Sequence, residues 1–382
     1  MKGEDSESAC IKQYLSTVGA RNEATAKTYK QRLRRFEESV MPEKMDDVIK
    51  KLQKGKLDPY NVLAGFHSYM QKRKVVDRSQ VHAIKTAKIF LEYNDIEISN
   101  QKFKRKVLLP RPVRKQKQPL SKKDVTAIID ACKGDLRLYT YVMFLAATGC
   151  RATEAILVRN QDLHLDDPIQ PFVWIKGEHT KTRSDRIVYL TAEIVRQLKE
   201  WLDTKYRERR TQYDHDKDKT IYGKYRPEPT ENDYVFYPMH HKGTKQPEPR
   251  SVYVYLDHAF QARMKIAKRA VKEDGLARHR VTFHSLRRFV KTEISNLGHA
   301  DFSEHFIGHL GSEYYNTSDE KKIELFHKIE PYLTFLDISQ LEARGADQQT
   351  RLDQMQEELR KERLERDKLY AQLYKAGVIK KE

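Results

Sequence analysis

The sequence predicts a mainly α-helical protein with a small β-sheet, divided into two domains and a polar helical tail. The first hundred residues carry apolar side chains at helical spacing and show no strand-like alternation. In the middle of the chain, the β-branched and aromatic runs "FVWIKG" and "RIVYL" flank a polar stretch. The 382 residues are enough for two or three domains.

Residues 1–103 are expected to form a compact helical domain with basic faces. "EATAKTYKQRLRRFEESV" places Tyr29, Leu33 and Phe36 at helical spacing, and "VHAIKTAKIFLEYN" repeats the pattern. Either Asn22 or Thr25 can start the first of these helices.

Residues 104–118 are predicted to be a basic interdomain linker. Prolines at positions 110, 112 and 119 interrupt any helix, and basic residues dominate the stretch "KFKRKVLLPRPVRKQKQPLSKKD". The segment is interpreted as a solvated linker, and its charge also suits it to follow a phosphate backbone.

Residues 119–338 are expected to form a second domain that is helical with a small β component. "SKKDVTAIIDAC" indicates a capped helix, and "RLYTYVMFLAATGCRATEAILV" indicates a buried helix, a glycine break and a second helix. "FVWIKG" and "RIVYL" predict a hairpin with a long loop. The polar stretch 205–250 is predicted to be surface loop with one short strand at "DYVFY", and Tyr332 is expected in the core.

The last segment, residues 339–382, is polar and favours helix. Several leucines fit a and d positions of a heptad, but Glu362 and Arg366 interrupt that seam. A short, weak coiled coil and a solitary solvated helix both remain open.

The charge balance indicates an anionic partner. Lys and Arg total 73 against 55 Asp and Glu, a formal net charge of +18. Nucleic acid is the first candidate, ahead of anionic lipid, because no segment approaches the about 20 apolar residues of a membrane span. The start "MKGEDSESACIKQYL" lacks a signal-peptide pattern, so a cytoplasmic location is expected. Cys10, Cys132 and Cys150 fit neither a disulfide framework nor a CxxC metal site.

Candidate DNA-binding residues are basic positions of the helical domain and of the linker. They are Arg32, Lys85, Lys88, Lys104, Arg105, Lys106, Arg114, Lys115 and Lys117.

Side chains suited to attack on a phosphodiester gather in the second domain. They are Arg151, Lys181, His284, Arg287, His309, Tyr314 and Tyr315, with Glu154 beside the first arginine. Arginines offer bidentate hydrogen bonds to phosphate oxygens and counter the charge of the transition state. A lysine on a hairpin can protonate the leaving oxygen, which is worth about 10²–10⁴ in rate, and a tyrosine can be the nucleophile.

Each element also has an ordinary interpretation. Arg151 and Glu154, three residues apart on a helix, are most often a surface pair. His305 and His309 have metal-ligand spacing, but there is no HExxH glutamate and no carboxylate cluster, so neither metal nor cofactor is expected.

Taken in order, these motifs resemble the tyrosine recombinase (phage integrase) family. The matching stretches are "ATGCRATEAILV", "WIKGEHTKTRSDRIVYL", "FHSLRRFVKTEI" and "FIGHLGSEYYNTSDE". The resemblance covers roughly residues 119–338. Within the family, the sequence is similar to integrases of archaeal plasmids and viruses. Residues 1–103 are similar to the family's core-binding, DNA-binding domain.

The resemblance assigns a role to each candidate. Arg151 and Arg287 look like the two phosphate-clamping arginines, and Glu154 looks like the acidic residue that orients the first. Lys181 resembles the general-acid lysine, with Lys176 the less favoured choice; His284 looks like the HxxR histidine and His309 like that of the GH pair.

The position of the nucleophile departs from the commoner bacterial pattern. Tyr314 and Tyr315 follow His309 by five and six residues, a shorter connection than usual in the family. Aligning the downstream "TSDE", an N-cap with acidic residues, favours Tyr314, with Tyr315 as the alternative.

The resemblance implies site-specific recombination of duplex DNA through a 3′-phosphotyrosyl intermediate, by a protein that acts as a tetramer. A type IB topoisomerase is an alternative with similar chemistry, and a non-catalytic DNA-binding protein that kept the fold is another. The sequence identifies neither the DNA site nor the direction of the reaction.

Overall fold

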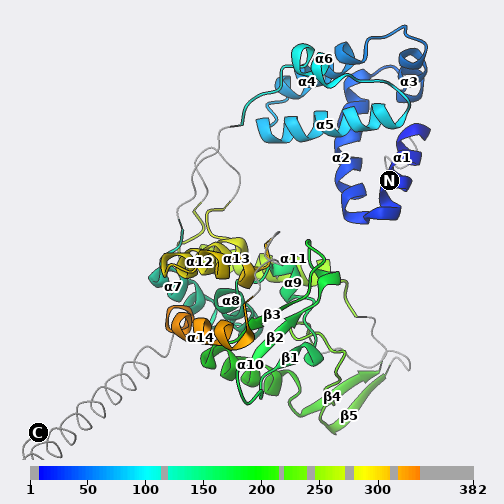
Figure 1. Ribbon diagram of the computed structural model, residues 1–382. Helices are drawn as coiled ribbons and strands as arrows, with labels where there is room; N and C mark the ends of the chain where they lie inside the picture. The colour runs from blue at the N-terminus through cyan, green and yellow to red at the C-terminus, as the bar shows by residue number, and fades with distance from the viewer. Residues whose placement is uncertain are drawn as a thin grey trace, which may run out of the picture. The chain divides into compact units, whose positions relative to one another are not determined.

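The computed structural model describes residues 8–112, 119–214, 219–238, 246–271, 279–309 and 317–335, without the side chains of strand residues 211–214, 219–222 and 225. The chain divides into two compact units, Met1–Lys117 and Gln118–Glu382 (Figure 1). Several predicted features lie outside the described residues: both candidate tyrosines, the tail and the linker residues Arg114, Lys115 and Lys117. Among the described helices, none has the length and apolar character to cross a membrane.

The first unit is helical throughout its described residues, as predicted. Its helices are α1 (Ala9–Arg21), α2 (Glu23–Val40), α3 (Met45–Gln53), α4 (Pro59–Lys72), α5 (Asp77–Tyr93) and α6 (Asn100–Lys106). Asn22 caps α2, because its side chain accepts a hydrogen bond of 2.9 Å from the backbone N–H of Thr25.

The core of the first unit lies where α2, α4 and α5 pack together. Phe36, Phe66 and Phe90, one from each helix, are at most 1% exposed. The rings of Phe36 and Phe66 are 5.0 Å apart. The three aromatic side chains therefore tie the three helices into one body.

The start of the predicted linker is helical. The prediction placed the linker from residue 104, but α6 continues to Lys106. The reason is that Phe103 and Val107, four residues apart, are both buried in the core of the first unit. Lys104, Arg105 and Lys106 therefore occupy the exposed last turn of a helix.

The second unit combines helices with a small antiparallel sheet, which confirms the predicted fold class. Its α-helices are α7 (Lys122–Cys132), α8 (Leu136–Thr148), α9 (Ala152–Ala155), α10 (Ala192–Lys205), α11 (Pro249–Ile266), α12 (Phe283–Asn296), α13 (Ala300–Ile307) and α14 (Asp319–Ile329). Short 3₁₀ helices are η1 (Asn160–Asp162), η2 (Gly177–His179) and η4 (Glu330–Leu333). Helix α8 is central: from Leu138 to Thr148 every residue is buried, and α7, α10 and α12 pack against it.

The sheet has the order β1 (Leu163–His164), β2 (Phe172–Ile175), β3 (Arg186–Tyr189). Strands β2 and β3 pair antiparallel, with Ile175 opposite Arg186, so the predicted hairpin is confirmed. A second hairpin, β4 (Arg209–Asp214) with β5 (Lys219–Tyr225), projects at the edge of the unit and was not predicted (Figure 1).

Two predictions about this unit are wrong. "DYVFY" is not a strand: Val235, Phe236 and Tyr237 are all buried in a turn, and only Tyr234 forms an isolated bridge, to Arg159. The backbone N–H of Tyr237 donates back to the carbonyl oxygen of Tyr234 over 3.3 Å, which closes a turn instead of continuing a strand ladder. Tyr332 is not core; it is 43% exposed, because η4 turns it outward while Leu333 is buried.

Candidate active site

The site begins at the break that ends α8. Gly149 has a left-handed backbone (φ +63°), and a Cβ there would lie 3.0–3.1 Å from Val290 of α12 and Ile307 of α13. Glycine is therefore required both by the turn and by the close packing. The turn redirects the chain so that Arg151 stands at the N-cap of α9.

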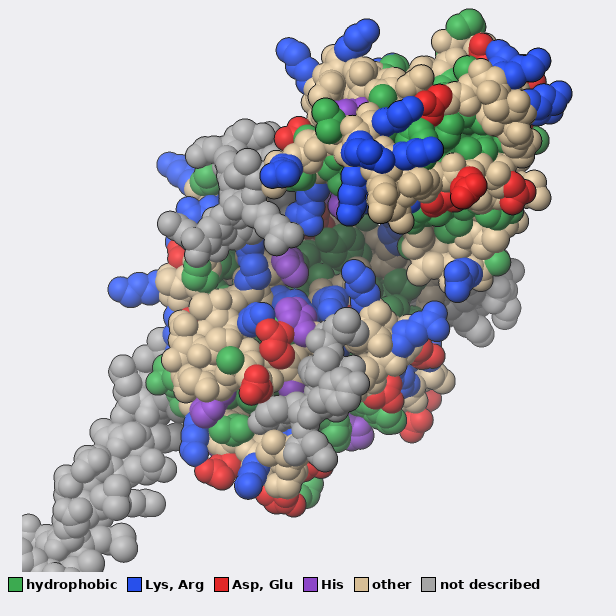
Figure 2. Space-filling model, turned by 45° about the horizontal axis from the view of Figure 1, so that its top comes forward, with side chains coloured by type: hydrophobic (Ala, Val, Ile, Leu, Met, Phe, Trp, Pro, Cys, Tyr) green, Lys and Arg blue, Asp and Glu red, His purple; other side chains and the backbone are tan. Residues whose placement is uncertain are grey.

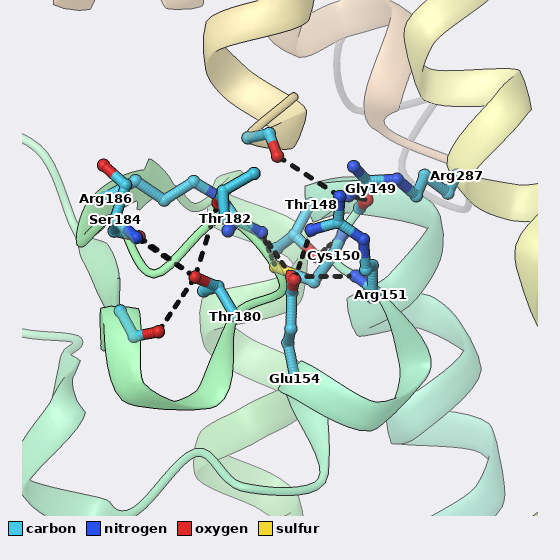
Figure 3. Close-up of polar contacts among 12 residues, drawn as sticks. Thr148, Gly149, Cys150, Arg151, Glu154, Thr180, Thr182, Ser184, Arg186 and Arg287 are labelled. Atoms are coloured by element: carbon cyan, nitrogen blue, oxygen red, sulfur yellow. Dashed lines mark hydrogen bonds and ion pairs between the residues drawn. The ribbon is translucent and has the colours of Figure 1, made fainter. Parts of the chain in front are cut away.

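Arg151 is held by the carboxylate of Glu154. Its Nη1 lies 2.5 Å from Glu154 Oε1, and its backbone N–H donates to Oε2 over 3.2 Å (Figure 3). The Glu154 side chain is only 1% exposed, whereas that of Arg151 is 25% exposed. The predicted pair is thus not a surface pair: a buried carboxylate anchors an arginine whose head remains accessible.

A second arginine, Arg186 of β3, shares the same carboxylate. Its Nη2 lies 2.6 Å from Glu154 Oε2, and its side chain is 4% exposed (Figure 3). Burial alone would raise the pKa of Glu154, but Arg186 and Arg151 outweigh burial and hold that pKa below its usual value. Glu154 therefore stays ionised.

Arg287 of α12 completes the group, which we call the arginine cluster: Arg151, Arg186 and Arg287 around Glu154. Arg287 is 3% exposed, and its Nη1 donates to the carbonyl oxygen of Gly149 over 2.8 Å (Figure 3). Burial and the neighbouring Arg151 lower the pKa of Arg287 to about 10. Its Nη2 is buried and has no hydrogen-bond partner among the described residues.

The arginine cluster carries more positive than negative charge. Three guanidinium groups surround one carboxylate, and the pKa of Arg287 is lowered partly because Arg151 repels it. A pocket of about 450 Å³ opens beside them, lined by Arg151, His284 and Arg287 and, from α11, by Tyr253, Gln261 and one carboxylate, that of Asp257. An anion entering this pocket would supply the missing negative charge.

His309 follows the left-handed C-cap of α13, Gly308. Its Nδ1 contacts the carboxylate of Glu304, which also pairs with Lys291. Burial lowers the pKa of His309 and Arg287 lowers it further, although Glu304 acts in the opposite direction. The ring is therefore neutral at neutral pH, and the carboxylate holds the proton on Nδ1, which leaves Nε2 as an acceptor.

The two candidate lysines of the β2–β3 loop differ in their surroundings. Lys176 forms an ion pair of 3.1 Å with the buried Asp162. Lys181 lies in the exposed part of the loop. His284, also exposed, projects from the first turn of α12, one turn before Arg287.

Comparison with known proteins settles the family. The phage integrase family matches residues 118–317, more than half of the chain and all of the described site. The chain belongs to the phage integrase family, that is, to the tyrosine recombinases.

Solved structures of integrases have the same fold. The lambda integrase dimer bound to a COC′ core site is 13% identical, with a TM-score of 0.53 over 81% of this chain and 97% of that one. The Tn1549 transposon integrase in complex with transposon right end DNA is 11% identical, with a TM-score of 0.51 over 83% and 98%. The lambda integrase tetramer bound to a Holliday junction is 12% identical, with a TM-score of 0.51 over 82% and 80%. No curated protein matches the sequence.

In this integrase family member, the site residues predicted from the sequence differ in how closely the structure brings them together. Arg151 and Glu154 contact each other directly, Arg287 lies close enough for both charges to act on its pKa, and His284 lines the same pocket as the two arginines. His309 is coupled to the cluster through the charge of Arg287. Lys181 is on the exposed loop, and both tyrosines lie outside the described residues.

The sequence prediction missed Arg186. A signal was present, because positions 186 and 188 share one face of β3 and Val188 is a core residue, while Ile187 between them is 46% exposed. An arginine at an inward-facing strand position requires a buried anion, and Glu154 is that anion.

The predicted DNA-binding residues of the first unit have different surroundings. Lys106 pairs with Asp58 at 2.7 Å and Lys88 with Glu92 at 3.0 Å. Arg32 and Lys85 lie close enough to His82, on α5, to lower its pKa, together with burial. Figure 2 shows one face of the molecule, on which Lys and Arg side chains stand out over Asp and Glu.

Within the described residues there is no group of three or more His, Cys, Asp or Glu side chains that could hold a metal ion. Cys132 and Cys150 are buried and unpaired, and Cys10 is partly buried.

Proposed function

We propose that this protein is a site-specific DNA recombinase that cuts and rejoins strands through a 3′-phosphotyrosyl intermediate, without a metal or nucleotide cofactor. The observation that carries the proposal is the excess positive charge of the arginine cluster beside an open pocket. A scissile phosphate, with charge that grows in the transition state, fits such a site.

Each residue would contribute one part of the reaction. Arg151 and Arg287 would hold the non-bridging phosphate oxygens, and His284 would add a hydrogen bond at the same pocket. His309, whose Nδ1 contacts Glu304, would accept or share a proton at Nε2. Lys181, on an exposed loop, would protonate the leaving 5′ oxygen.

The nucleophile would come from the segment between His309 and helix α14. Ser318 caps that helix, since its side chain accepts from the backbone N–H of Lys321, and Asp319 begins it. This supports the alignment that favours Tyr314, with Tyr315 as the alternative.

The chemistry balances without an external reagent. The tyrosine oxygen would attack phosphorus as the bond to the 5′ oxygen breaks, which leaves a 3′-phosphotyrosyl bond and a free 5′-hydroxyl. The 5′-hydroxyl of a partner strand would reverse the step. The free energy of the broken phosphodiester bond is retained in the phosphotyrosyl bond, so no nucleotide is consumed.

The remaining parts would serve DNA binding and assembly. The helical unit, with Arg32 and Lys85 near each other, and the basic residues 104–118 would contact the duplex backbone. The DNA-bound lambda integrase dimer and the tetramer on a Holliday junction support duplex DNA as the partner and a tetramer as the active assembly. The likeness to integrases of archaeal mobile elements and the role of the tail as a contact between protomers stay predictions.

A covalent-trapping assay tests the proposal. Nicked suicide duplexes taken from the DNA that flanks the gene would be incubated without metal with wild type, Tyr314→Phe and Tyr315→Phe. We expect a protein–DNA adduct with wild type that is lost only in Tyr314→Phe, as seen on denaturing gels and by peptide mass. Loss only in Tyr315→Phe would move the nucleophile by one residue. DNA that binds but never becomes covalently attached would overturn the proposal.

A second readout separates recombination from relaxation. Two sites on one supercoiled circle would be offered to the wild-type protein. Recombinant circles are expected from a recombinase, whereas relaxed circles alone would indicate a topoisomerase.

A further inference from the structure

Glu154 has two arginine partners, and the proposed reaction uses only one of them. Arg151 reaches the pocket, but Arg186 does not line it. Arg186 donates to Glu154 Oε2 at 2.6 Å and lies 3.8 Å from the sulfur of Cys150. A buried guanidinium is expensive to desolvate, and apolar residues often replace a buried ion pair without loss of stability. Its presence at the start of β3 therefore indicates a role other than stabilising the fold.

Arg186 also lies directly under the turn that leads to His309. A Cβ placed on Gly308 would be 2.7 Å from Arg186 Nη1 and 2.8 Å from its Cζ. The carbonyl oxygen of the same glycine accepts a hydrogen bond of 3.4 Å from Arg151 Nη2. Gly308 is thus packed against one arginine and hydrogen-bonded to the other.

These contacts close a ring that joins three elements. Arg186 of β3 bonds Glu154 of α9, Glu154 bonds Arg151 at the N-cap of α9, Arg151 bonds Gly308 at the C-cap of α13, and Gly308 packs on Arg186. Figure 3 shows Arg151 and Arg186 converging on Glu154 from different parts of the chain. Each member is therefore in contact with two others of the ring.

We propose that Arg186 is a positioning residue for strand cleavage: through Glu154 it fixes the orientation of Arg151, and through Gly308 it fixes the turn that carries His309. This inference rests on the proposed function. Arg186 touches no substrate, because it is buried and lies outside the pocket lining. Its role is to hold Arg151, which would bind the phosphate, and His309 at fixed positions relative to each other.

The test compares Arg186→Gln with Arg186→Lys, and with Arg159→Gln as a matched control. Arg159 lies in the same unit, donates to Asn232 at 3.0 Å and packs over the ring of Tyr234, but does not contact Glu154. Single-turnover cleavage of the suicide duplex at saturating protein would be measured beside the equilibrium affinity for the same DNA. We expect Arg186→Gln to reduce the cleavage rate about 10- to 100-fold with little change in affinity. Arg159→Gln should leave both quantities near wild type.

The pH profile adds a readout that a purely structural role would not move. Glu154 faces Arg151 and Cys150 of the α8–α9 turn, Arg186 of β3 and Arg287 of α12. Cleavage needs Glu154 ionised, and loss of one cation raises its pKa, so activity should disappear at a higher pH as the solution is acidified. Arg186→Lys keeps the charge and should restore the profile toward wild type.

A double-mutant cycle with Glu154→Gln decides whether Arg186 acts through Glu154. Two residues of one hydrogen-bonded network are strongly non-additive, so Arg186→Gln should cost much less in the Glu154→Gln background. Additive losses would overturn the proposal, and so would an Arg186→Gln enzyme with the rate and pH profile of wild type. If Arg186→Gln does not fold, the cycle is run with Arg186→Met, which removes the charge and leaves no unpaired polar group at the buried position. Failure of wild type to form any adduct would instead refute the proposed function.

Discussion

At the level of single residues, the two arginines that line the pocket are held in different ways. Arg151 depends on a side chain, the carboxylate of Glu154, and Arg287 depends on a backbone carbonyl, that of Gly149. Both arrangements aim a guanidinium toward the same pocket. The difference allows the contribution of Glu154 to be measured separately.

Glu154→Gln is expected to destabilise the second unit as well as slow cleavage. Removal of one partner of a buried ion pair costs about 3–5 kcal/mol, because the other charge stays buried and uncompensated. Urea unfolding followed by circular dichroism measures the loss. Glu324→Gln is the control: that carboxylate is 66% exposed and pairs with Lys328, so little change in the free energy of unfolding is expected. Equal stabilities of the two variants would contradict the assigned role of Glu154.

Besides the step that belongs to Glu154, the cleavage profile is expected to have an acid limb that follows His309. A base works only while it is unprotonated, so activity is present above its pKa and lost as the pH falls through it. Because burial and Arg287 lower the pKa of His309, activity should persist to a lower pH than an ordinary histidine would allow. Glu304 raises this pKa and Lys291 lowers it. Glu304→Gln should therefore shift the limb to lower pH and Lys291→Met to higher pH; shifts in the same direction would exclude His309 as the titrating group.

Single residues of the site could be predicted where chemistry restricts the choice. Arg151, Glu154, His284 and Arg287 stand at helical spacing in short motifs, and the structure brings them together. Arg186 could not be recognised in the same way, because its partner is 32 residues away and no local pattern pairs them.

At the level of elements, the C-cap of α13 is the point where the chain passes closest to Arg186. Gly308→Ala would combine a left-handed backbone (φ +68°) with a clash against the buried Arg186 guanidinium. Gly298→Ala is a matched control, since Gly298 also has positive φ (+88°) but its Cβ would meet nothing within 4 Å. The backbone strain is about 1–2 kcal/mol at either position. Thermal melts should show Gly308→Ala as the less stable variant. Equal melting temperatures would mean that the Arg186 side chain moves aside without a loss of stability.

Elements were predictable where apolar residues had a clear period. The helices of the first unit and the β2–β3 hairpin are examples. Strands β4 and β5 have no such period, because their sequences, "RRTQYD" and "KTIYGKY", are mostly polar. "DYVFY" misled for the opposite reason: its apolar residues are buried by a turn whose backbone bonds to the segment after α9, with Val235 N–H donating to the carbonyl of Val158.

At the level of the whole molecule, the two units have separate cores. Phe36, Phe66 and Phe90 belong to the first core, and the residues of α8 belong to the second. Fragments 1–117 and 118–382 should therefore each unfold cooperatively when expressed alone, as measured by circular dichroism in urea. The larger fragment should keep the site but bind DNA less tightly than the full chain. A fragment 118–382 without cooperative unfolding would show that its core needs the first unit.

The overall charge favours a kind of partner but does not identify it. A net charge of +18 favours a polyanion, and the arginine cluster adds a local reason for phosphate. The DNA sequence that is recognised depends on groove contacts and DNA deformation, which neither composition nor motifs encode.

The carbonyl group that holds Arg287 is part of the main chain, and no codon change can delete it. Glu154, which holds Arg151, can be lost by an ordinary substitution, so the supports of the two pocket arginines differ in how easily a mutation removes them. Only a replacement of Gly149 itself would disturb the Arg287 side, and the left-handed turn and the crowding by Val290 and Ile307 oppose every such replacement. Inactive natural variants that retain the fold should therefore have lost the support of Arg151 more often than that of Arg287.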